Sequence, residues 1–428
     1  MQSFVIEGGH PLRGEVTPSG NKNAALPLIA ACLLTDQPIL LRNLPDIGDV
    51  RTMRALVETL GVSVEASDGH TWSVQAGQVR KADLDPEMCR RIRASILLAG
   101  PLLARTGEAV LPPPGGDVIG RRRVDTHLLA LRPFGVETDF RQGLLHLRAP
   151  TGLHGARVLL DEASVTATEN AILTAVTARG STTIRNAASE PHVQDLCHLL
   201  ITLGGHIENI GSNTLHIEGV SALHGGEYTI GPDYLEVVSF IGGAAITGGE
   251  VRIHNAAPEH LEMVRLVLGR LGIVWQDEGA DLHVPSGQTL HVVPDLRGAI
   301  PQISVMPWPA FPTDLMSLAI VLATQAAGTV LFHDWMFESR MFFIDKLTAM
   351  GAHIVLCDPH RCLVQGPSRL VGEQLESPDI RAGLALVTAS LAAQGASRIR
   401  NIGQIERGYE RIDDKLKSLG AHIHRVED

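Results

Sequence analysis

The sequence predicts an α/β protein of two similar domains, each made of three repeated units with buried inner helices and outer sheets. The main observation is a helix-like segment that ends in a Leu-rich turn and a glycine and is followed by an alternating strand. It occurs six times, at Gly61, Gly135, Gly204, Gly272, Gly351 and Gly420. The intervals between these glycines are 74, 69, 68, 79 and 69 residues. Units of about seventy residues close into globules, which favours two sets of three over one long repeat array.

A second pattern accompanies the first in these units. An apolar, Ala-rich helical segment is followed by a short strand that ends in a polar pair, as in segments 25–43, 169–186 and 383–401, with looser copies that end at Asn255 and Asp334. Helices with so few charges are buried on most sides, so we expect one helix of each unit to be more buried than the other. The glycines predict helix ends in the left-handed conformation, followed by strands of period two.

Composition excludes several classes of protein. The chain has 428 residues, of which 44% are hydrophobic and 19% charged, as in ordinary globular proteins. Asp and Glu outnumber Lys and Arg by 47 to 36, which gives a net charge of −11. This charge argues against non-specific nucleic-acid binding, which requires clustered positive charge. Aromatic residues make up only 4%, so a stacking platform for single strands is not expected.

Cysteine usage and the N-terminal segment predict the compartment. Five cysteines in a long chain fit a reducing environment without a disulfide framework. The segment from Cys357 to Cys362 contains two thiols and His360, but it has no second ligand pair, so we interpret these residues as turn residues beside a strand. No signal peptide is visible, and the apolar stretches 24–34 and 94–104 are too short to span a membrane. We therefore expect a cytoplasmic protein that does not bind membranes.

Two segments of the first half could carry chemistry. Lys22 follows Ser19-Gly20-Asn21 at the start of an apolar helix, where a cation is electrostatically unfavourable. It therefore either faces an anion or is a solvated lysine beside a turn. Segment 112–125 is rich in Pro and Gly and contains Asp117 beside three consecutive arginines. It is either a lid that carries an acid and anion-binding guanidiniums or a charged, solvated loop.

In the second half, Asp314 directly precedes the apolar stretch 315–327. It is either a helix cap or a group that takes part in chemistry. Arg340, Arg381 and Arg407 lie at or near predicted helix starts, and each alone would be read as a surface or ion-pair residue. No phosphate-binding Walker loop, dinucleotide fingerprint or Ser-His-Asp set is present in the order of the residues.

Together, the segments SGNKNAALPL, RASILLAGPL, LPPPGGDVIGRRRVD, FPTD, RAGLALVTA and RGYERIDDKLKSLGA resemble the UDP-N-acetylglucosamine 1-carboxyvinyltransferase family over nearly the whole chain. The resemblance implies the enolpyruvyl transferase fold of two inside-out α/β domains. The first domain would comprise 22–231, and the second would comprise 1–21 plus 232–428. It also implies transfer of the enolpyruvyl group of phosphoenolpyruvate to the 3-hydroxyl of UDP-N-acetylglucosamine, with release of phosphate, in peptidoglycan synthesis. Neither a metal nor an organic cofactor is implied.

The resemblance also assigns roles to residues of this sequence. Asp117 matches the general acid, Asp314 matches the base, and Lys22 and Arg407 complete the implied catalytic set. Arg122 joins Lys22 and Arg407 as a cation for phosphoenolpyruvate, with Arg93 and Arg381 nearby. The remaining implied substrate contacts are Asn23, Arg123, Asp125, Ser164, Val165, Met336 and Arg340.

Several positions depart from the family pattern. Asp117 stands where most members have a cysteine that fosfomycin alkylates, so we expect resistance to that inhibitor. Gly48, Arg123, Glu162, Thr166 and Tyr234 also differ from the usual residues. In particular, Glu162 replaces a lysine and would repel a diphosphate unless Arg123 compensates.

These departures leave two alternatives to the leading function. One is a paralogue that transfers enolpyruvyl to a different hydroxylated or nucleotide-linked acceptor, and the other is a silent ligand-binding homologue. The expected partners are the two small substrates and no nucleic acid. We expect a monomer.

Overall fold

Six small sheets contain all the strands that the computed structural model assigns over residues 2–80 and 83–427, the part of the chain that it describes. The chain divides into two units by its internal contacts. Unit 1 comprises the residues as far as Ser19, Val118–Arg122 and the residues from Pro232 onward, and unit 2 comprises Gly20–Asp117 and Arg123–Gly231. Each unit has three of the sheets and its own hydrophobic core. The domain boundaries given above stay a prediction.

The sheets of unit 1 have four strands each. In spatial order they are β21 (Gln374–Glu376), β22 (Ala396–Arg400), β1 (Gln2–Glu7) and β23 (His422–Glu427); β15 (Gln276–Glu278), β16 (Asp281–Val284), β14 (Glu250–Ile253) and β2 (Arg13–Val16); and β17 (Gln302–Ser304), β18 (Gly328–His333), β20 (Arg361–Gly366) and β19 (His353–Asp358).

Unit 2 has two sheets of four strands and one of three. They are β11 (His206–Glu208), β12 (Thr214–Glu218), β10 (Ser181–Arg185) and β9 (Arg157–Leu159); β13 (Gly226–Thr229), β3 (Ile39–Arg42), β5 (Trp72–Gln75) and β4 (Ser63–Ala66); and β6 (Glu108–Leu111), β8 (Leu144–Arg148) and β7 (Glu137–Arg141).

One pairing scheme recurs in these sheets. The strand that follows an inner helix pairs in parallel with an edge strand and antiparallel with a hairpin strand, as β3 does with β13 and β5. In the three-stranded sheet, a parallel bridge between Asp83 and Val110 stands in the place of the fourth strand. In the sheet of β22 the hairpin partner is instead β1, which lies between β22 and β23 and pairs antiparallel with both. The two ends of the described chain therefore meet in one sheet of unit 1.

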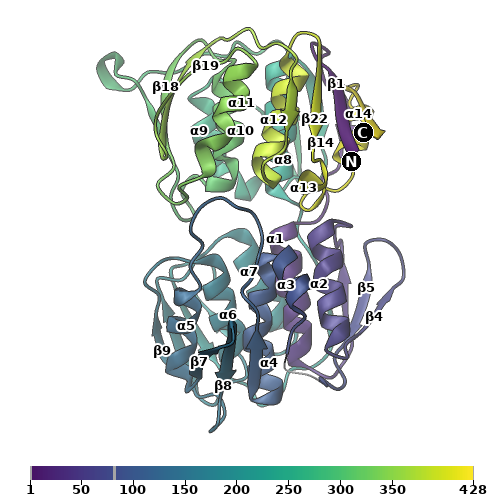
Figure 1. Cartoon of the computed structure of the whole chain (residues 1–428), viewed down its shortest axis with the longest axis vertical. Helices are drawn as coiled ribbons and strands as arrows, with labels where there is room; N and C mark the ends of the chain where they lie inside the picture. The colour runs from purple at the N-terminus through teal and green to yellow at the C-terminus, as the bar shows by residue number, and fades with distance from the viewer. Residues whose placement is uncertain (1, 81–82, 428) are drawn as a thin grey trace. The chain divides into compact units, whose positions relative to one another are not determined.

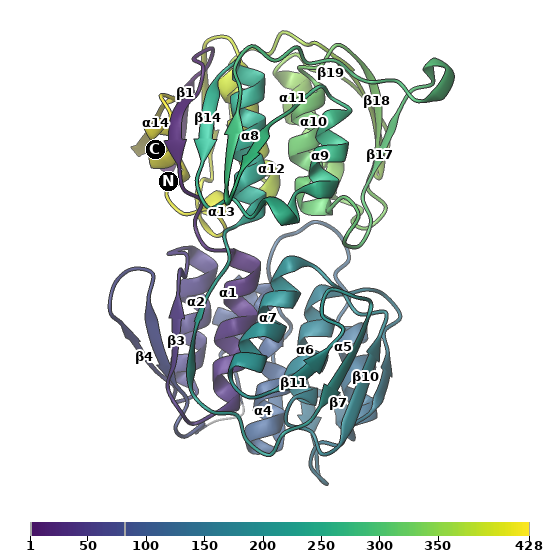
Figure 2. The ribbon, with the colours of Figure 1, turned by 180° about the vertical axis from the view of Figure 1, so that it is seen from behind.

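The helices fall into an inner and an outer set (Figures 1 and 2). The inner helices are α1 (Lys22–Ala31), α4 (Ala99–Thr106, preceded by η2, Arg93–Leu98), α6 (Val165–Ala175), α8 (Tyr234–Thr247), α10 (Met316–Ala323, preceded by η6, Thr313–Leu315) and α12 (Ile380–Ala392). The outer helices are α2 (Gly48–Thr59), α5 (Asp125–Leu131), α7 (Pro191–Thr202), α9 (Glu262–Gly269), α11 (Ile344–Ala349) and α14 (Ile412–Ser418). Shorter helices are η1 (Cys32–Leu34), α3 (Pro86–Arg91), η3 (Arg132–Phe134), η4 (Pro258–His260), η5 (Leu296–Gly298), η7 (Arg340–Phe343) and α13 (Gly403–Glu406).

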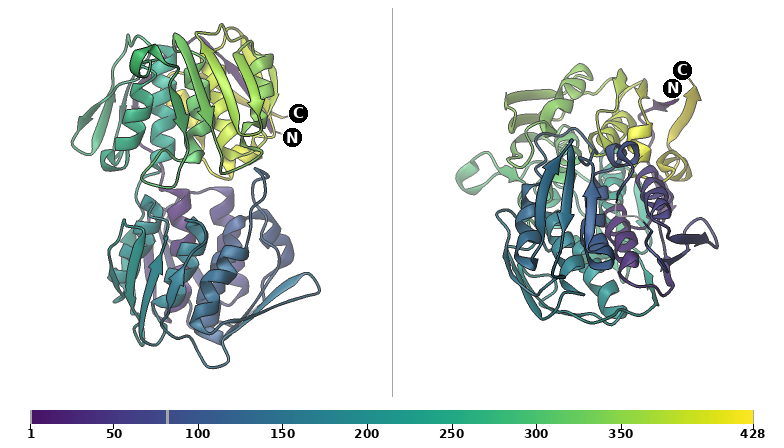
Figure 3. Two further views of the ribbon diagram at one scale, coloured as in Figure 1. Left: turned by 90° about the vertical axis from the view of Figure 1, so that its left-hand side faces the viewer. Right: turned by 60° about the horizontal axis from the view of Figure 1, so that its bottom comes forward.

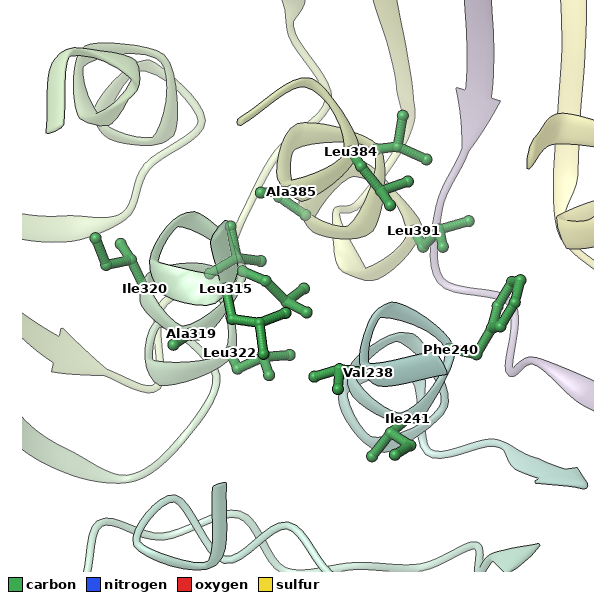
Figure 4. Close-up of a cluster of buried hydrophobic side chains, with 14 of the residues drawn as sticks. Val238, Phe240, Ile241, Leu315, Ala319, Ile320, Leu322, Leu384, Ala385 and Leu391 are labelled. Carbon is green, nitrogen blue, oxygen red and sulfur yellow. The ribbon is translucent and has the colours of Figure 1, made fainter. Parts of the chain in front are cut away.

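The inner helices are buried on nearly all sides. Every residue of α10 is buried, and α12 is buried from Ile380 to Leu391. Figure 4 shows α8, α10 and α12 almost along their axes; some labelled side chains, such as Val238 and Leu322, lie between the helices, and others, such as Ile320 and Phe240, point away from them. Within each unit, the strands lie outside the helices (Figure 3). This arrangement of inner helices and outer sheets confirms the predicted fold class.

The glycine repeat has the predicted backbone geometry. All six glycines have φ between 78° and 97°, the left-handed region that a residue with a Cβ enters only with strain. Each is followed within a few residues by a strand, namely β4, β7, β11, β15, β19 and β23. Asparagines of the second repeat, Asn43, Asn186, Asn255 and Asn401, also have positive φ at the ends of their strands. These turns direct the chain from each sheet to the next outer helix.

No helix of the described part of the chain is long and apolar enough to cross a membrane.

Candidate active site

Half of the predicted site residues lie at the N-terminal starts of inner helices. In unit 2, Lys22 and Asn23 open α1, Arg93 opens η2, and Ser164 caps α6 just before Val165. In unit 1, Asp314 lies in η6 before α10, and Arg381 is the second residue of α12. The repeat therefore places chemically active residue types at equivalent points of its inner helices, where the helix dipole favours anions.

Lys22 is buried and forms a short ion pair. Its Nζ lies 2.8 Å from Oδ2 of Asp49, and both side chains are less than a tenth exposed. Asn21 caps the same helix, because its Oδ1 accepts a hydrogen bond from the backbone N–H of Ala24 at 3.0 Å. The interpretation of Lys22 as a solvated lysine is wrong. Lys22 was expected to face an anion, and the carboxylate of Asp49 is such an anion. Asp49 lies in the first turn of α2, and no sequence pattern indicated this contact.

Arg93 and Arg123 are joined through the backbone. Arg93 Nη2 donates to the carbonyl oxygen of Arg123 at 2.8 Å. The guanidinium of Arg123 binds Asp161 at 3.0 Å and approaches Asp125 at 3.5 Å. The hydrogen bond to Asp161 holds the pKa of Arg123 above its usual value. Arg123 is therefore held by these two aspartates.

Glu162, the residue that Arg123 was expected to compensate, makes a different contact. Its Oε1 lies 3.1 Å from the hydroxyl of Thr126, which also donates to Asp161 at 2.9 Å. That hydroxyl contact and the Arg123 guanidinium hold the pKa of Asp161 low. The carbonyl of Glu162 accepts the N–H of Ser164 and thereby shapes the turn before α6. No contact between Arg123 and Glu162 is found among the described side chains, so the expected compensation does not take this form.

The loop that carries Asp117 contributes to both units. Asp117, which is partly buried, belongs to unit 2, whereas the next residues, Val118–Arg122, belong to unit 1. Within unit 1, the carboxylate of Glu338 accepts the N–H of Arg121 at 3.0 Å, and the N–H of Ser339 donates to the carbonyl of Ile119 at 3.1 Å. These two bonds fix the backbone directly before Arg122.

Asp314 is the centre of a charged cluster in unit 1. Arg340 Nη2 donates to its Oδ1 at 3.1 Å, and Arg381 Nε donates to its Oδ2 at 3.2 Å. Both arginine side chains are 5% exposed or less, whereas the carboxylate is 28% exposed. The interpretation of Asp314 as a helix cap is wrong, because Pro312 occupies the cap position of η6. Of the two interpretations of Arg340 and Arg381, surface residue or ion-pair residue, the second is correct, because both are buried and paired with Asp314.

Tyr409 and Asp379 support this cluster. Arg381 Nη1 donates to the Tyr409 hydroxyl at 2.7 Å, and burial raises the pKa of Tyr409 to about 12, so the phenol stays neutral. Asp379 caps α12 by accepting the N–H groups of Arg381 and Ala382, and it lies 4.0 Å from Arg340. Tyr409 belongs to the quoted segment RGYERIDDKLKSLGA but was given no role there. These contacts leave the Asp314 carboxylate one defined orientation with a solvent-facing edge.

Arg407 and Met336 lie elsewhere in unit 1. Arg407 ends α13 as its C-terminal cap, shortly before α14 begins, and donates to Oε1 of Gln404 at 2.9 Å. Met336 packs against the core, and its N–H donates to Oδ1 of Asp334 at 3.0 Å. Asp334 also accepts the hydroxyl of Thr313 at 2.6 Å. It therefore couples the backbone at Met336 to the residue beside Asp314.

Groups that could hold a metal are sparse in the described residues. Glu7, His10 and His422 form the one such group, at the end of β1, just after it and at the start of β23, and it contains none of the predicted site residues. Cys357 and Cys362 lie within strands β19 and β20 rather than in the turn, and Cys362 is buried.

Comparisons with known proteins agree in fold and family. Residues 6–416 match the family model of EPSP synthase (3-phosphoshikimate 1-carboxyvinyltransferase). The chain is 56% identical over 425 residues to the UDP-N-acetylglucosamine 1-carboxyvinyltransferase of Bradyrhizobium diazoefficiens, covering 99% of this chain and 98% of that protein. It is 52% identical over 427 residues to the enzyme of the same name from Treponema denticola, covering all of both chains.

Solved structures give the same result for the fold. The enolpyruvyl transferase NikO from Streptomyces tendae superimposes with a TM-score of 0.87 at 25% identity, over 99% of both chains. An EPSP synthase from Acinetobacter baumannii superimposes with a TM-score of 0.77 at 18% identity, over the whole of both chains.

Proposed function

The chain belongs to the UDP-N-acetylglucosamine 1-carboxyvinyltransferase family within the enolpyruvyl transferases, and we propose a residue-level mechanism for its reaction from this premise. The enzyme transfers the enolpyruvyl group of phosphoenolpyruvate to the 3-hydroxyl of UDP-N-acetylglucosamine, releases phosphate and thereby supplies a peptidoglycan precursor. The observation that carries this function is identity above one half over the full length of a curated relative.

The reaction requires three chemical events. The methylene carbon of phosphoenolpyruvate gains a proton, the sugar oxygen bonds to the neighbouring carbon, and the adduct then loses a methyl proton together with phosphate. An acid must supply the first proton and a base must accept the proton of the sugar hydroxyl. We assign these roles to Asp117 and Asp314.

The geometry of Asp314 supports its role as the base. Each carboxylate oxygen is held by one guanidinium, so the side chain does not rotate freely. A quarter of the carboxylate stays exposed, which leaves it accessible to a substrate hydroxyl. The positive charge of Arg340 and Arg381 also compensates the negative charge of the substrates that arrive beside it.

Phosphoenolpyruvate carries a phosphate and a carboxylate and needs several cations. We assign Lys22, Arg122 and Arg407 to this task, with Arg93 and Arg381 nearby. Lys22 is supported by its place at the start of α1, where the helix dipole adds to its charge. Asn23, Arg123, Asp125, Ser164, Val165, Met336 and Arg340 remain proposed contacts of the sugar nucleotide. A cytoplasmic location and a monomeric state also stay predictions.

Phosphate release with a panel of acceptors tests the function. The purified enzyme with phosphoenolpyruvate should release phosphate with UDP-N-acetylglucosamine and not with UDP-glucose, free N-acetylglucosamine or shikimate 3-phosphate. Release with another acceptor alone would identify the paralogue, and release with none would identify the silent homologue. Mass spectrometry of the sugar nucleotide should show the added enolpyruvyl group.

A further inference from the structure

A buried hydrogen-bond network in unit 2 ends at the hydroxyl of Thr166. The network joins Asn170 on α6, His127 on α5 and Thr166 in the first turn of α6. Asn170 and His127 are almost fully buried, whereas Thr166 is partly exposed. Such a network has few ways to arrange its protons, so the direction of each hydrogen bond can be worked out.

The orientation of the Asn170 amide is fixed by the backbone on both sides. Its Oδ1 accepts the N–H of Gly100 at 3.2 Å, and its Nδ2 donates to the carbonyl of Ile96 at 2.8 Å. A flipped amide would lose both bonds. The second N–H of the same Nδ2 therefore points to Nδ1 of His127, at 2.9 Å.

The Asn170 amide in turn fixes the tautomer of His127. Because Nδ1 accepts a hydrogen bond from Asn170, the proton of the neutral ring is on Nε2. Burial, with a smaller contribution from the charge of Arg93, lowers the pKa of His127 to about 3, so the ring is neutral at pH 7. Nε2 then donates to Oγ1 of Thr166 at 3.1 Å.

Thr166 therefore accepts from His127 and must direct its own proton elsewhere. None of the described residues accepts a hydrogen bond from the Thr166 hydroxyl. Ser164 and Val165, two proposed contacts of the sugar nucleotide, directly precede it. The structure thus presents one oriented donor at the exposed start of α6.

We propose that the Thr166 hydroxyl donates a hydrogen bond to an uncharged oxygen of UDP-N-acetylglucosamine and that His127 is the positioning residue that directs it. This inference rests on the proposed function and extends it to the recognition of the sugar nucleotide. The neighbouring carboxylates of Asp161 and Glu162, both in contact with Thr126, disfavour the phosphoenolpyruvate anion at this point. A neutral donor suits a hydroxyl or carbonyl oxygen of the larger substrate instead.

Steady-state kinetics of substitutions at Thr166 test the proposal. Thr166→Val keeps the shape of the side chain but removes the donor, and it should raise the KM for UDP-N-acetylglucosamine about tenfold. The KM for phosphoenolpyruvate should stay unchanged, and Thr166→Ser should restore the KM for the sugar nucleotide. The melting temperature of Thr166→Val should fall by a few degrees, because the buried Nε2–H of His127 loses its acceptor. Thr183→Val is the matched control, because Thr183 forms a Thr–His bond of the same 3.1 Å length with His216 on the outer sheet. It should alter neither KM.

Substitutions at His127 test the positioning role. In His127→Gln the amide nitrogen can replace Nε2 and still donate to Thr166, so the KM for the sugar nucleotide should stay within about twofold of wild type. His127→Asn keeps only the acceptor for Asn170 and should raise that KM about threefold. Combined with Thr166→Val, His127→Asn should have no further effect on the KM, because the group that it directs is gone.

The outcomes separate this proposal from the proposed function. If wild type releases no phosphate with UDP-N-acetylglucosamine, the function itself is wrong. If wild type is active but Thr166→Val leaves the KM for the sugar nucleotide unchanged, only the present proposal fails. An equal rise in both KM values would assign Thr166 a structural role and also overturn the proposal.

Discussion

The charged clusters around Asp314 in unit 1 and around Arg123 in unit 2 are built in opposite ways. Arg340 and Arg381 are buried and converge on a single carboxylate, Asp314. In the other cluster Arg123 is 42% exposed and lies between two carboxylates, Asp125 and Asp161, which are themselves largely exposed. In the first cluster two arginines hold one carboxylate, and in the second two carboxylates hold one arginine.

The difference teaches where the enzyme tolerates change. A buried group that loses its charge partner is destabilised by several kcal/mol, whereas an exposed ion pair contributes only about 0–1 kcal/mol. Two of the departures from the family pattern, Arg123 and Glu162, lie in the exposed cluster. By the resemblance, the residues assigned to proton transfer and buried cation binding keep the family types, apart from the aspartate at 117.

The largest effect is expected at the buried cluster. Asp314→Asn should lower the single-turnover rate about a thousandfold, because an amide cannot accept the hydroxyl proton. Binding of UDP-N-acetylglucosamine by calorimetry should change little. Asp345→Asn, an exposed aspartate of the same unit, is the control and should keep full activity. An unchanged single-turnover rate would leave Asp314 a purely structural partner of the two arginines.

Asp117, the proposed acid on the loop, belongs to neither of the two charged clusters and can be tested separately from them. Asp117→Asn should lower phosphate release more than a hundredfold, since the amide cannot donate the proton. Asp117→Cys should retain activity and become sensitive to fosfomycin, because a thiolate is the more reactive nucleophile. Intact-protein mass spectrometry should show the inhibitor adduct only in the cysteine variant. An adduct on the wild-type loop would contradict this prediction.

The buried ion pair of Lys22 and Asp49 lies in unit 2, the unit that also contains the exposed cluster around Arg123. Lys22→Gln leaves the Asp49 carboxylate buried without its cation, which should destabilise the protein by about 3 kcal/mol and lower the melting temperature by several degrees. The catalytic efficiency with phosphoenolpyruvate should fall at least a hundredfold. Lys346→Gln removes a more exposed pair and should shift the melting temperature by less than about one degree. Near-normal turnover of Lys22→Gln would remove Lys22 from the catalytic set.

The buried His127 makes stability depend on pH. Its pKa of about 3 lies below the value near 6.5 of the unfolded chain, so its contribution to stability is complete above pH 6.5 and is lost as the pH falls toward 3. Between pH 7 and 5 this loss amounts to about 2 kcal/mol. In urea titrations, His127→Gln should lose less stability than wild type over this interval. Parallel losses would show that the ring is not kept neutral by burial.

Arg123 should give the smallest effect. Arg123→Ala removes an exposed, doubly paired guanidinium and should change the free energy of unfolding by less than about 1 kcal/mol. The KM for UDP-N-acetylglucosamine should rise only a few-fold, and more at low salt than at high salt, because exposed charges are screened. A change as large as that of Asp314→Asn would abolish the distinction between the two clusters.

The fold was predictable because its signals are local. The glycines at helix ends and the charge-free helices follow from backbone sterics and burial, which depend on residues close in sequence. Side-chain partners were not predictable in this way. Asp49 lies 27 residues from Lys22, and Tyr409 lies 28 residues from Arg381, and no periodicity links either pair. For the same reason Arg123 was considered as a compensating charge for Glu162, whereas the structure pairs it with Asp161.

The place of β1 between β22 and β23 has a consequence for synthesis on the ribosome. All residues of unit 2 have been synthesised once the chain has passed Gly231. This unit can therefore fold before most of unit 1 has been made. Strand β1 emerges before unit 2, whereas both of its sheet neighbours, residues 396–400 and 422–427, emerge after it. Throughout elongation its two edges stay without their final partners, and such edges are sites of unwanted association. Strand β1 therefore needs protection in the nascent chain until residues 396–400 and 422–427 have emerged.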